Sequence, residues 1–140
     1  MDGNLKREII LDNYENPYNR GLIDDDTYLK TRVSSDSCID EIDVMMKIVD
    51  DKIVDIRFDG EACVISTAAT SIMIRNLIGK SVGYAKKLLL NYNNMINELD
   101  YDKEMLGELG VYDEICKQPN RKGCALVPSK AISKILEKLK

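Results

Sequence analysis

"EIDVMMKIVDDKIVDIRFDGEACVISTAATSIMIRNLIG", residues 41–79, contains two hydrophobic periods in succession. In 41–49 and 52–59, apolar residues alternate with more polar ones, which is typical of strands with one buried face. The alternating apolar residues are Ile42, Val44, Met46, Ile48, Val54, Ile56 and Phe58. Beyond the second strand the apolar spacing changes to three and four, which indicates a helix that ends at Gly79. The segment therefore predicts a β-hairpin, turned at 50–52, followed by a helix that can cover one face of it.

The segments that precede this hairpin are expected to form a helix, a loop and a short strand. Residues 4–15 have helical apolar spacing, and Asn16 should end the helix because a residue that precedes a proline is disfavoured in the α conformation. The next residues, 16–26, are rich in turn formers and predict a surface loop. Residues 28–33 are expected to form a short edge strand.

The segments that follow the hairpin are expected to be helical. Ser81 is a candidate N-cap for a helix that reaches about Asn91. Residues 95–116 are expected to be helical but irregular, since two glycines interrupt them. Residues 117–123 predict a loop.

The last helix is expected to begin near Cys124. Pro128 would then lie in its first turn, where a proline removes no intrahelical hydrogen bond. Together the segments predict an α+β fold, in which a small, about three-stranded antiparallel sheet packs against helices. The length of 140 residues suits a single domain, 1–140.

Composition excludes several classes of protein. The net charge is −4, with 20 basic and 24 acidic residues, which is not the basic footprint of a nucleic-acid-binding protein. No apolar run approaches the roughly 18 residues of a membrane helix, and the N-terminus lacks the apolar core of a signal peptide. We therefore expect a cytoplasmic protein with reduced thiols, and neither a membrane nor a nucleic acid as a partner.

A basic bias occurs only at the end of the chain. The last helix carries a run of four lysines, Lys130, Lys134, Lys138 and Lys140. Solvated helix charges are the ordinary explanation for such a run. A docking patch for an acidic partner is the alternative.

The four cysteines point to metal or redox chemistry, because a reduced compartment disfavours disulfides. The chain has no histidine, which excludes Cys-His and Ser-His catalysis and His-containing metal sites. Cys63 and Cys124 fall at expected helix N-termini, where a thiolate is favoured, and Cys38 falls in a loop two residues before Asp40. If these residues converge, they form a Cys3Asp set that suits tetrahedral zinc. The alternative is that the cysteines are buried as small hydrophobic residues, which is the interpretation we favour for Cys116.

Three sequence blocks resemble the SufU-type proteins of the wider IscU/NifU-N-like iron–sulfur cluster assembly family. In "REIILDNYENPYNRG" (7–21) the helix ends in the family's Asn-Pro-x-Asn-x-Gly turn. "GEACVISTAATSIM" (60–73) matches its Gly-x-x-Cys-x-Ile-Ser block, and "PNRKGCAL" (119–126) matches its Pro-x-Arg-x-x-Cys-Ala block. The blocks occur in the family's order and extend over almost the whole chain.

The subgroup can be inferred from the third block. IscU-type members carry a histidine directly before the third cysteine and a chaperone-recognition stretch ahead of it. Here Gly123 takes the histidine's position, and 117–121 lacks the chaperone motif. The chain is therefore similar to SufU-type proteins, which also have an arginine at the position of Arg121.

The resemblance implies a zinc-dependent sulfur acceptor that works with a cysteine desulfurase rather than a stand-alone enzyme. Cys38, Asp40, Cys63 and Cys124 would bind one zinc per chain, and Cys38 would also accept the sulfur. The donor would be a SufS-like, PLP-dependent, homodimeric cysteine desulfurase that carries a persulfide. The sulfur would then pass to a downstream scaffold for iron–sulfur cluster assembly.

Two other functions remain open from the sequence. The same ligands could assemble a transient [2Fe–2S] cluster, because thiolates suit both zinc and iron–sulfur clusters. The zinc could instead be purely structural, so that chelation unfolds the protein. Arg121 is expected either to pair with Asp40 and gate the site or to be an exposed loop cation.

The first cysteine block departs from the family pattern. The family has Asn-Pro-x-Cys-Gly-Asp, whereas this chain has "SDSCID" at 35–40. Cys38 and Asp40 match the pattern, but Ile39 replaces the glycine and cannot readily adopt a positive φ. We therefore expect a different loop conformation around Cys38.

Overall fold

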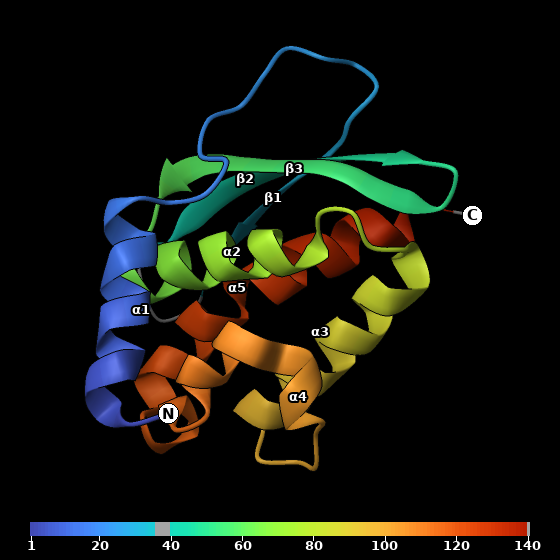
Figure 1. Cartoon of the computed structure of the whole chain (residues 1–140). Coiled ribbons are helices and arrows are strands. Elements are labelled where there is room, and N and C mark those ends of the chain that lie inside the picture. The colour runs from blue at the N-terminus through green and yellow to red at the C-terminus, as the bar shows by residue number, and fades with distance from the viewer. Residues whose placement is uncertain (36–39, 140) are drawn as a thin grey trace.

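The computed structural model describes residues 1–35 and 40–139. Its centre is a three-stranded antiparallel sheet in the order β1-β2-β3, with the helices on one face and the loop after α1 on the other (Figure 1). The strands are β1 (Leu29–Ser34), β2 (Glu41–Val49) and β3 (Lys52–Glu61). The helices are α1 (Gly3–Glu15), α2 (Val64–Leu77), α3 (Val82–Ile96), α4 (Lys103–Leu106) and α5 (Pro119–Glu137), with short 3₁₀ helices η1 (Gly107–Tyr112) and η2 (Ile115–Lys117). The predicted α+β fold with a small antiparallel sheet is confirmed.

A two-residue turn joins β2 to β3 where the sequence predicts the hairpin. Asp50 and Asp51 have φ values of 50° and 65°. A left-handed conformation at both central residues is the geometry that lets a tight turn follow the twist of two antiparallel strands. The turn therefore fixes the pairing of Val49 with Lys52 at the end of the hairpin.

A β-bulge makes the predicted alternation in β3 wrong at one position. Lys47 pairs with Asp55 and Ile48 pairs with Ile53, so Val54 is an extra residue on the β3 side. An extra residue reverses the faces on which the neighbouring side chains lie. Val54 is consequently 45% exposed, and Ile53 is buried in its place.

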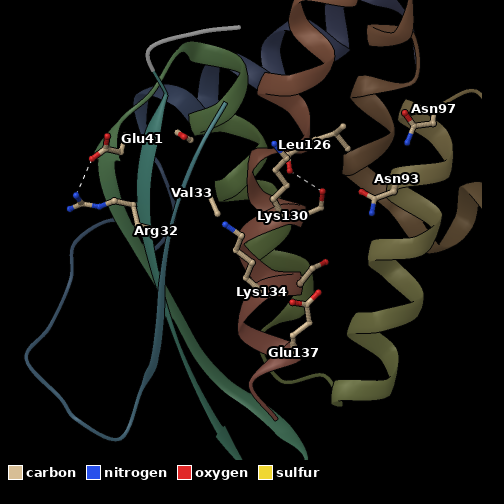
Figure 2. Close-up of a pocket in the computed structure, with 12 residues that line it drawn as sticks. Arg32, Val33, Glu41, Asn93, Asn97, Leu126, Lys130, Lys134 and Glu137 are labelled. Carbon is tan, nitrogen blue, oxygen red and sulfur yellow. Dashed lines mark hydrogen bonds and ion pairs between the residues drawn. The ribbon is translucent and has the colours of Figure 1, made fainter. Parts of the chain in front are cut away.

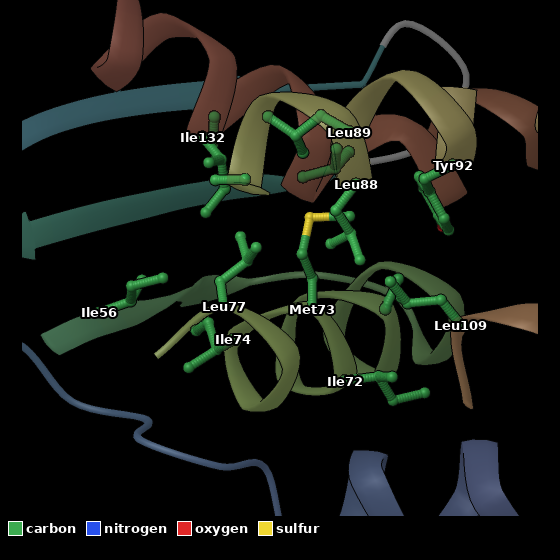
Figure 3. Packing of buried hydrophobic residues seen from close by; sticks show 14 of the residues in the cluster. Ile56, Ile72, Met73, Ile74, Leu77, Leu88, Leu89, Tyr92, Leu109 and Ile132 are labelled. Atoms are coloured by element: carbon green, nitrogen blue, oxygen red, sulfur yellow. The ribbon is translucent and has the colours of Figure 1, made fainter. Parts of the chain in front are cut away.

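Helix α2 is the central element of the core. Ten of its residues are buried, including the consecutive run from Ser66 to Ile74, and it lies between the sheet, α1 and α5. Met73 and Leu77 point from α2 toward Leu88 of α3, and Leu109 of η1 closes the same cluster (Figure 3). A helix buried on nearly all sides is held rigidly, and a residue at its N-terminus is therefore positioned firmly.

The C-terminal half differs from the sequence predictions in two respects. Helix α3 continues to Ile96, five residues beyond the expected end. Helix α5 begins at Pro119, so the predicted loop over 117–123 is wrong for most of its length. Pro119 occupies the first position of the helix, where a proline is favoured because no hydrogen bond is lost there. The irregular stretch 95–116 contains α4 and the two 3₁₀ helices, as its glycines suggested.

Pro128 lies inside α5 and not in its first turn, contrary to prediction. A proline at this position cannot donate to the carbonyl of Cys124, four residues earlier. The hydroxyl oxygen of Ser66 on α2 lies 3.0 Å from that carbonyl oxygen. The proline thus makes the α5 backbone at Cys124 available to α2.

No helix in residues 1–35 and 40–139 is both long enough and apolar enough to cross a membrane.

Candidate metal centre

Three of the four predicted ligand residues converge at one end of the sheet. Asp40 immediately precedes β2, Cys63 immediately precedes α2, and Cys124 lies in the second turn of α5. One ligand atom from each lies within 4.8 Å of the other two. The fourth predicted ligand, Cys38, is outside the described residues.

Asp40 is held as a buried carboxylate by hydrogen bonds from four residues. It is 2% exposed, and its two oxygens accept from the Cys63 backbone N–H at 2.7 Å, the Ser66 hydroxyl at 2.6 Å and the Ser35 hydroxyl at 3.0 Å. Burial alone would raise the pKa of Asp40. The hydrogen bonds from Ser66, Cys63, Cys124 and Ser35 outweigh burial, and the pKa is lower than that of an exposed aspartate. The residue is therefore charged at neutral pH and is a candidate oxygen ligand.

Cys63 is the N-cap of α2, which confirms its predicted position at a helix N-terminus. Its extended backbone (φ −68°, ψ 171°) starts the helix, and its sulfur accepts from the Ser66 backbone N–H at 3.5 Å. The sulfur also lies 3.8 Å from an Asp40 carboxylate oxygen. The sulfur therefore lies beside the free N–H groups of the first helical turn.

Cys124 is fully buried and is not at a helix N-terminus, contrary to prediction. Because α5 begins at Pro119, the residue lies five positions after the helix start and beyond the strongest part of the helix dipole. Its side chain hydrogen-bonds to Asp40 instead. The position of Cys124 is fixed by packing of α5 on α2 and not by a helix end.

Ser66 and Ser35 are contacts of the site that the sequence prediction did not include. The Ser66 hydroxyl contacts Asp40 and the carbonyl of Cys124, and the Ser66 backbone N–H donates to the Cys63 sulfur. The Cys-x-x-Ser spacing was the available signal, since an N-cap residue bonds the residue three positions later. Ser35 could not have been found in this way, because its contact to Asp40 spans the first cysteine block.

The two remaining predicted positions have different outcomes. Arg121 lies exposed in the first turn of α5 and makes no ion pair with Asp40 in the part of the chain that the structure describes. Cys116 is half-buried, with its sulfur 4.0 Å from the carbonyl oxygen of Asp113, and belongs to no group of candidate ligands among the described residues. A pairing of Arg121 with Asp40 is therefore not observed, and a gating role stays a prediction.

The donor set fits zinc. Two thiols and one carboxylate are common zinc ligands, and a tetrahedral ion about 2.3 Å from each sulfur places its ligands about 3.5–4 Å apart. The observed spacing within 4.8 Å needs only a small contraction to reach that geometry. A hollow of 490 Å³ is lined by Asp40, by three further acidic side chains, Glu41, Asp43 and Glu61, and by one cation, Arg32, which pairs with Glu41 and Asp43. This acidic hollow favours the approach of a cation.

Removing the Ser66 hydroxyl is expected to weaken metal binding. Ser66→Ala deletes a hydrogen bond to buried Asp40, which should raise the pKa of that carboxyl and lower zinc affinity by about tenfold. Competition with a chromogenic chelator measures the affinity.

Ser71→Ala is the matched control for Ser66→Ala. Ser71 is also fully buried on α2, and its hydroxyl bonds Asn13 at 2.7 Å, away from the site. Each variant should lower the free energy of unfolding by about 1–3 kcal/mol. Equal loss of zinc affinity in both would show that Ser66 acts only through stability.

Comparison with known proteins identifies relatives of this chain. The NifU-like N-terminal domain matches residues 5–125. The zinc-dependent sulfurtransferase SufU of Bacillus subtilis strain 168 is 32% identical over 131 residues, covering 93% of this chain and 88% of that protein. The iron–sulfur cluster assembly scaffold protein IscU of Thermotoga maritima is 30% identical over 132 residues, covering 94% of this chain and 92% of that protein.

A solved structure agrees with these relatives. A protein of Fervidobacterium islandicum AW-1, described as an iron–sulfur cluster assembly scaffold for the SUF system, superposes with a TM-score of 0.81 at 29% identity, over 92% of this chain and 94% of that one. The resemblance inferred from the three sequence blocks is thereby confirmed. The chain belongs to the NifU-like N-terminal domain family of iron–sulfur cluster assembly proteins, together with its SufU- and IscU-type members.

Proposed function

We propose that this protein is a zinc-dependent sulfur acceptor for a cysteine desulfurase, with Cys38 as the accepting residue. The convergence of Asp40, Cys63 and Cys124 at the end of the loop that carries Cys38 is the observation that supports this most directly. The relationship to the zinc-dependent sulfurtransferase SufU supports the same function.

The proposed metal ligands are Cys38, Asp40, Cys63 and Cys124, with one zinc per chain. When bound, zinc would keep the thiols of these residues as thiolates, the nucleophilic form of cysteine. Two of these residues are positioned without the metal: Asp40 is already charged, and Cys63 is fixed as the N-cap of α2.

Cys38 is the best candidate for the acceptor because the other two cysteines of the proposed metal site, Cys63 and Cys124, are poorly placed for an encounter with a partner. Cys124 is fully buried, and Cys63 is half-buried and tied to the first turn of α2. Cys38 lies outside the described residues; the sequence predicts it in a loop, and loop residues can reposition at lower cost than residues on packed helices.

The proposed transfer is a thiol–persulfide exchange. The Cys38 thiolate would attack the terminal sulfur of a persulfide on the desulfurase and form a new S–S bond. The S–S bond of the donor would break, and the donor cysteine would leave as a thiolate with the electron pair. One sulfur atom moves and no net oxidation occurs, so no further redox partner is needed. The sulfur would then pass to a downstream scaffold of iron–sulfur cluster assembly.

Cys38→Ser is expected to abolish sulfur acceptance. After incubation with a PLP-dependent SufS-like desulfurase and cysteine, intact-mass and peptide mass spectrometry should find one added sulfur atom on Cys38 of the unaltered chain. The serine variant should gain no sulfur and should no longer stimulate the desulfurase. Cys116→Ser is the control and should accept sulfur normally, because Cys116 lies outside the ligand group. Persulfide formation on the Cys38→Ser chain would contradict the assignment.

A scaffold for a transient [2Fe–2S] cluster is the second candidate function. The IscU relative of Thermotoga maritima and the two thiols beside Asp40 support it. Anaerobic reconstitution with iron and sulfide in the presence of equimolar zinc separates the two functions. A stable cluster that displaces zinc would favour the scaffold, and retained zinc with no cluster absorbance would favour sulfur acceptance.

A further inference from the structure

The two edges of the sheet differ in how far other segments of the chain hydrogen-bond to them. Along β3, the Phe58 backbone bonds Asn19 and Gly21, and the Ile53 backbone bonds Gly79 and Lys80. These contacts cover that edge at both ends. Strand β1 forms the opposite edge of the sheet and has no strand beyond it among the described residues.

The β1 edge presents unpaired backbone groups at its C-terminal end. All six residues of β1 have partners in β2, and the backbone N–H and C=O groups of successive residues face alternately toward β2 and away from it. The Ser35 N–H bonds the Asp40 carbonyl next to this pairing, so the backbone groups of Val33 and Thr31 face β2 and those of Arg32 and Ser34 face outward. The side chain of Lys138, the C-cap of α5, donates to the outward carbonyl of Lys30. Within residues 1–35 and 40–139, no hydrogen-bond partner reaches the outward N–H and C=O groups of Arg32 and Ser34.

A groove of 550 Å³ lies directly beside this free edge. Its walls come from β1 and α3, and its floor is the solvent-facing side of α5. Figure 2 shows Lys134 extending from α5 toward β1, while Arg32 turns away from the groove to Glu41, with which it makes an ion pair at 3.0 Å.

The polar groups of the groove are suited to an acidic peptide. The groove is lined by Arg32, Lys130 and Lys134 and by two carboxylates, Glu41 and Glu137. Arg32 and Glu41 pair with each other, whereas Lys130 and Lys134 are exposed and make no ion pair in the described part of the chain, so the groove keeps a surplus of positive charge although the whole protein carries a net charge of −4. Residues four apart on a helix are about 6 Å apart along its axis, and alternate side chains of a strand are about 6.7 Å apart. Acidic side chains at alternate positions of an added strand would therefore match the two lysines.

The wall from α3 contributes an acceptor that lacks a donor. The side-chain oxygen of Asn93 is buried and has no hydrogen-bond partner among the described residues. Such an atom is costly to leave unpaired. An N–H group of a peptide in the groove would supply the missing donor.

We propose that the free edge of β1 and the exposed face of α5 form a docking groove for an extended, acidic segment of a partner protein, which adds to the sheet as a fourth strand. Backbone pairing with Arg32 and Ser34 would give affinity, and Lys130 and Lys134 would select acidic side chains. The inference does not depend on sulfur transfer, since it needs neither zinc nor Cys38. The groove adjoins the metal centre through Ser34 and Glu41, so a partner docked there would lie beside the site.

Hydrogen exchange gives a direct test of the strand addition. The probe is a synthetic peptide, as long as β1, in which glutamate alternates with valine, and the control peptide has glutamine in place of glutamate. In the free chain, the amides of Arg32 and Ser34 should exchange fast and those of Thr31 and Val33 slowly. At millimolar glutamate peptide, we expect exchange of the two outward amides to slow by at least about tenfold. No gain in protection at either amide would overturn the proposal.

Matched charge variants test the role of the lysines. Lys130→Gln with Lys134→Gln should weaken binding of the glutamate peptide by about tenfold, measured by fluorescence anisotropy. Lys87→Gln with Lys103→Gln removes the same charge from exposed positions outside the groove and should have little effect. If both double variants weakened peptide binding equally, the binding would reflect general electrostatic attraction to the protein, and docking in the groove would be contradicted.

Backbone N-methylation of the peptide separates strand pairing from charge attraction. A methyl group on an amide that faces β1 removes a hydrogen bond, whereas a methyl group on the next amide faces away from β1. Loss of affinity should therefore alternate along the peptide with a period of two residues. A uniform response to methylation would overturn strand addition even if the lysines prove important.

Discussion

Replacement of Cys63 by serine is expected to lower zinc affinity by about 100-fold or more. A serine hydroxyl is a far weaker zinc ligand than a thiolate. Because α2 holds residue 63 rigidly, the chain cannot shift there to bring another ligand to the metal. Cys124→Ser should have a similar effect, since its side chain contacts the same carboxylate of Asp40. Zinc per chain after gel filtration, followed by chelator competition, measures the loss.

Cys116→Ser separates ligand loss from a general effect of removing a thiol. Its sulfur is half-buried, like that of Cys63, but it belongs to no ligand group in the described chain. This variant should keep about one zinc per chain. A Cys63→Ser chain that also keeps one tightly bound zinc would exclude Cys63 as a ligand. Far-ultraviolet circular dichroism with and without chelator then tests whether the metal is structural, because a structural zinc predicts unfolding on its removal.

The N-terminal half of the fold could be predicted because its local signals agree with the packing. Period-two alternation defined β2 and most of β3, and period-three and -four spacing defined α2. The bulge at Val54 could not be predicted, because the sequence around it contains apolar residues on both possible faces. Pairing with β2 decides between Ile53 and Val54, and that information is not local.

The C-terminal half shows how local rules can mislead. The sequence predicts a loop over 117–123, which includes Pro119, and places Pro128 in the first turn of the last helix. The structure has Pro119 at the start and Pro128 inside α5, where the Ser66 hydroxyl contacts the Cys124 carbonyl that the proline leaves without its helical donor. This contact joins α2 to α5, and no pattern within α5 could reveal it.

The candidate site was predicted as a set of residues but not as an arrangement. Cysteine positions and family motifs identified Asp40, Cys63 and Cys124, and the structure brings these three together. The hydrogen bonds that hold Asp40 charged include those from Ser35, at the start of the first cysteine block, and from Ser66, on α2. Distances between elements decide such contacts, so they could not be predicted without the fold.

Gly60→Ala is expected to destabilise the protein by about 3 kcal/mol and to disturb the metal centre. Gly60 has φ +133°, a conformation that side-chain-bearing residues rarely adopt. A Cβ atom there would lie 2.2 Å from the Glu41 carbonyl oxygen and 2.9 Å from the Ile42 Cα. Both atoms are backbone of β2, the strand that pairs with β3 at this point, so the clash cannot be relieved by a rotamer change.

The clash would be transmitted to the ligands because Gly60 lies between them. Asp40 directly precedes Glu41, and Cys63 follows Gly60 by three residues, so separating β2 from β3 separates the two ligands. Urea unfolding and zinc affinity should therefore both be impaired. Gly83→Ala is the control: in the first turn of α3 its Cβ would meet only Ser81 Oγ at 3.9 Å, and a gain of about 0.5–1 kcal/mol is expected. A Gly60→Ala chain with unchanged stability would contradict the close approach of the strands, and one that loses stability but keeps full zinc affinity would show that the ligands do not depend on this pairing.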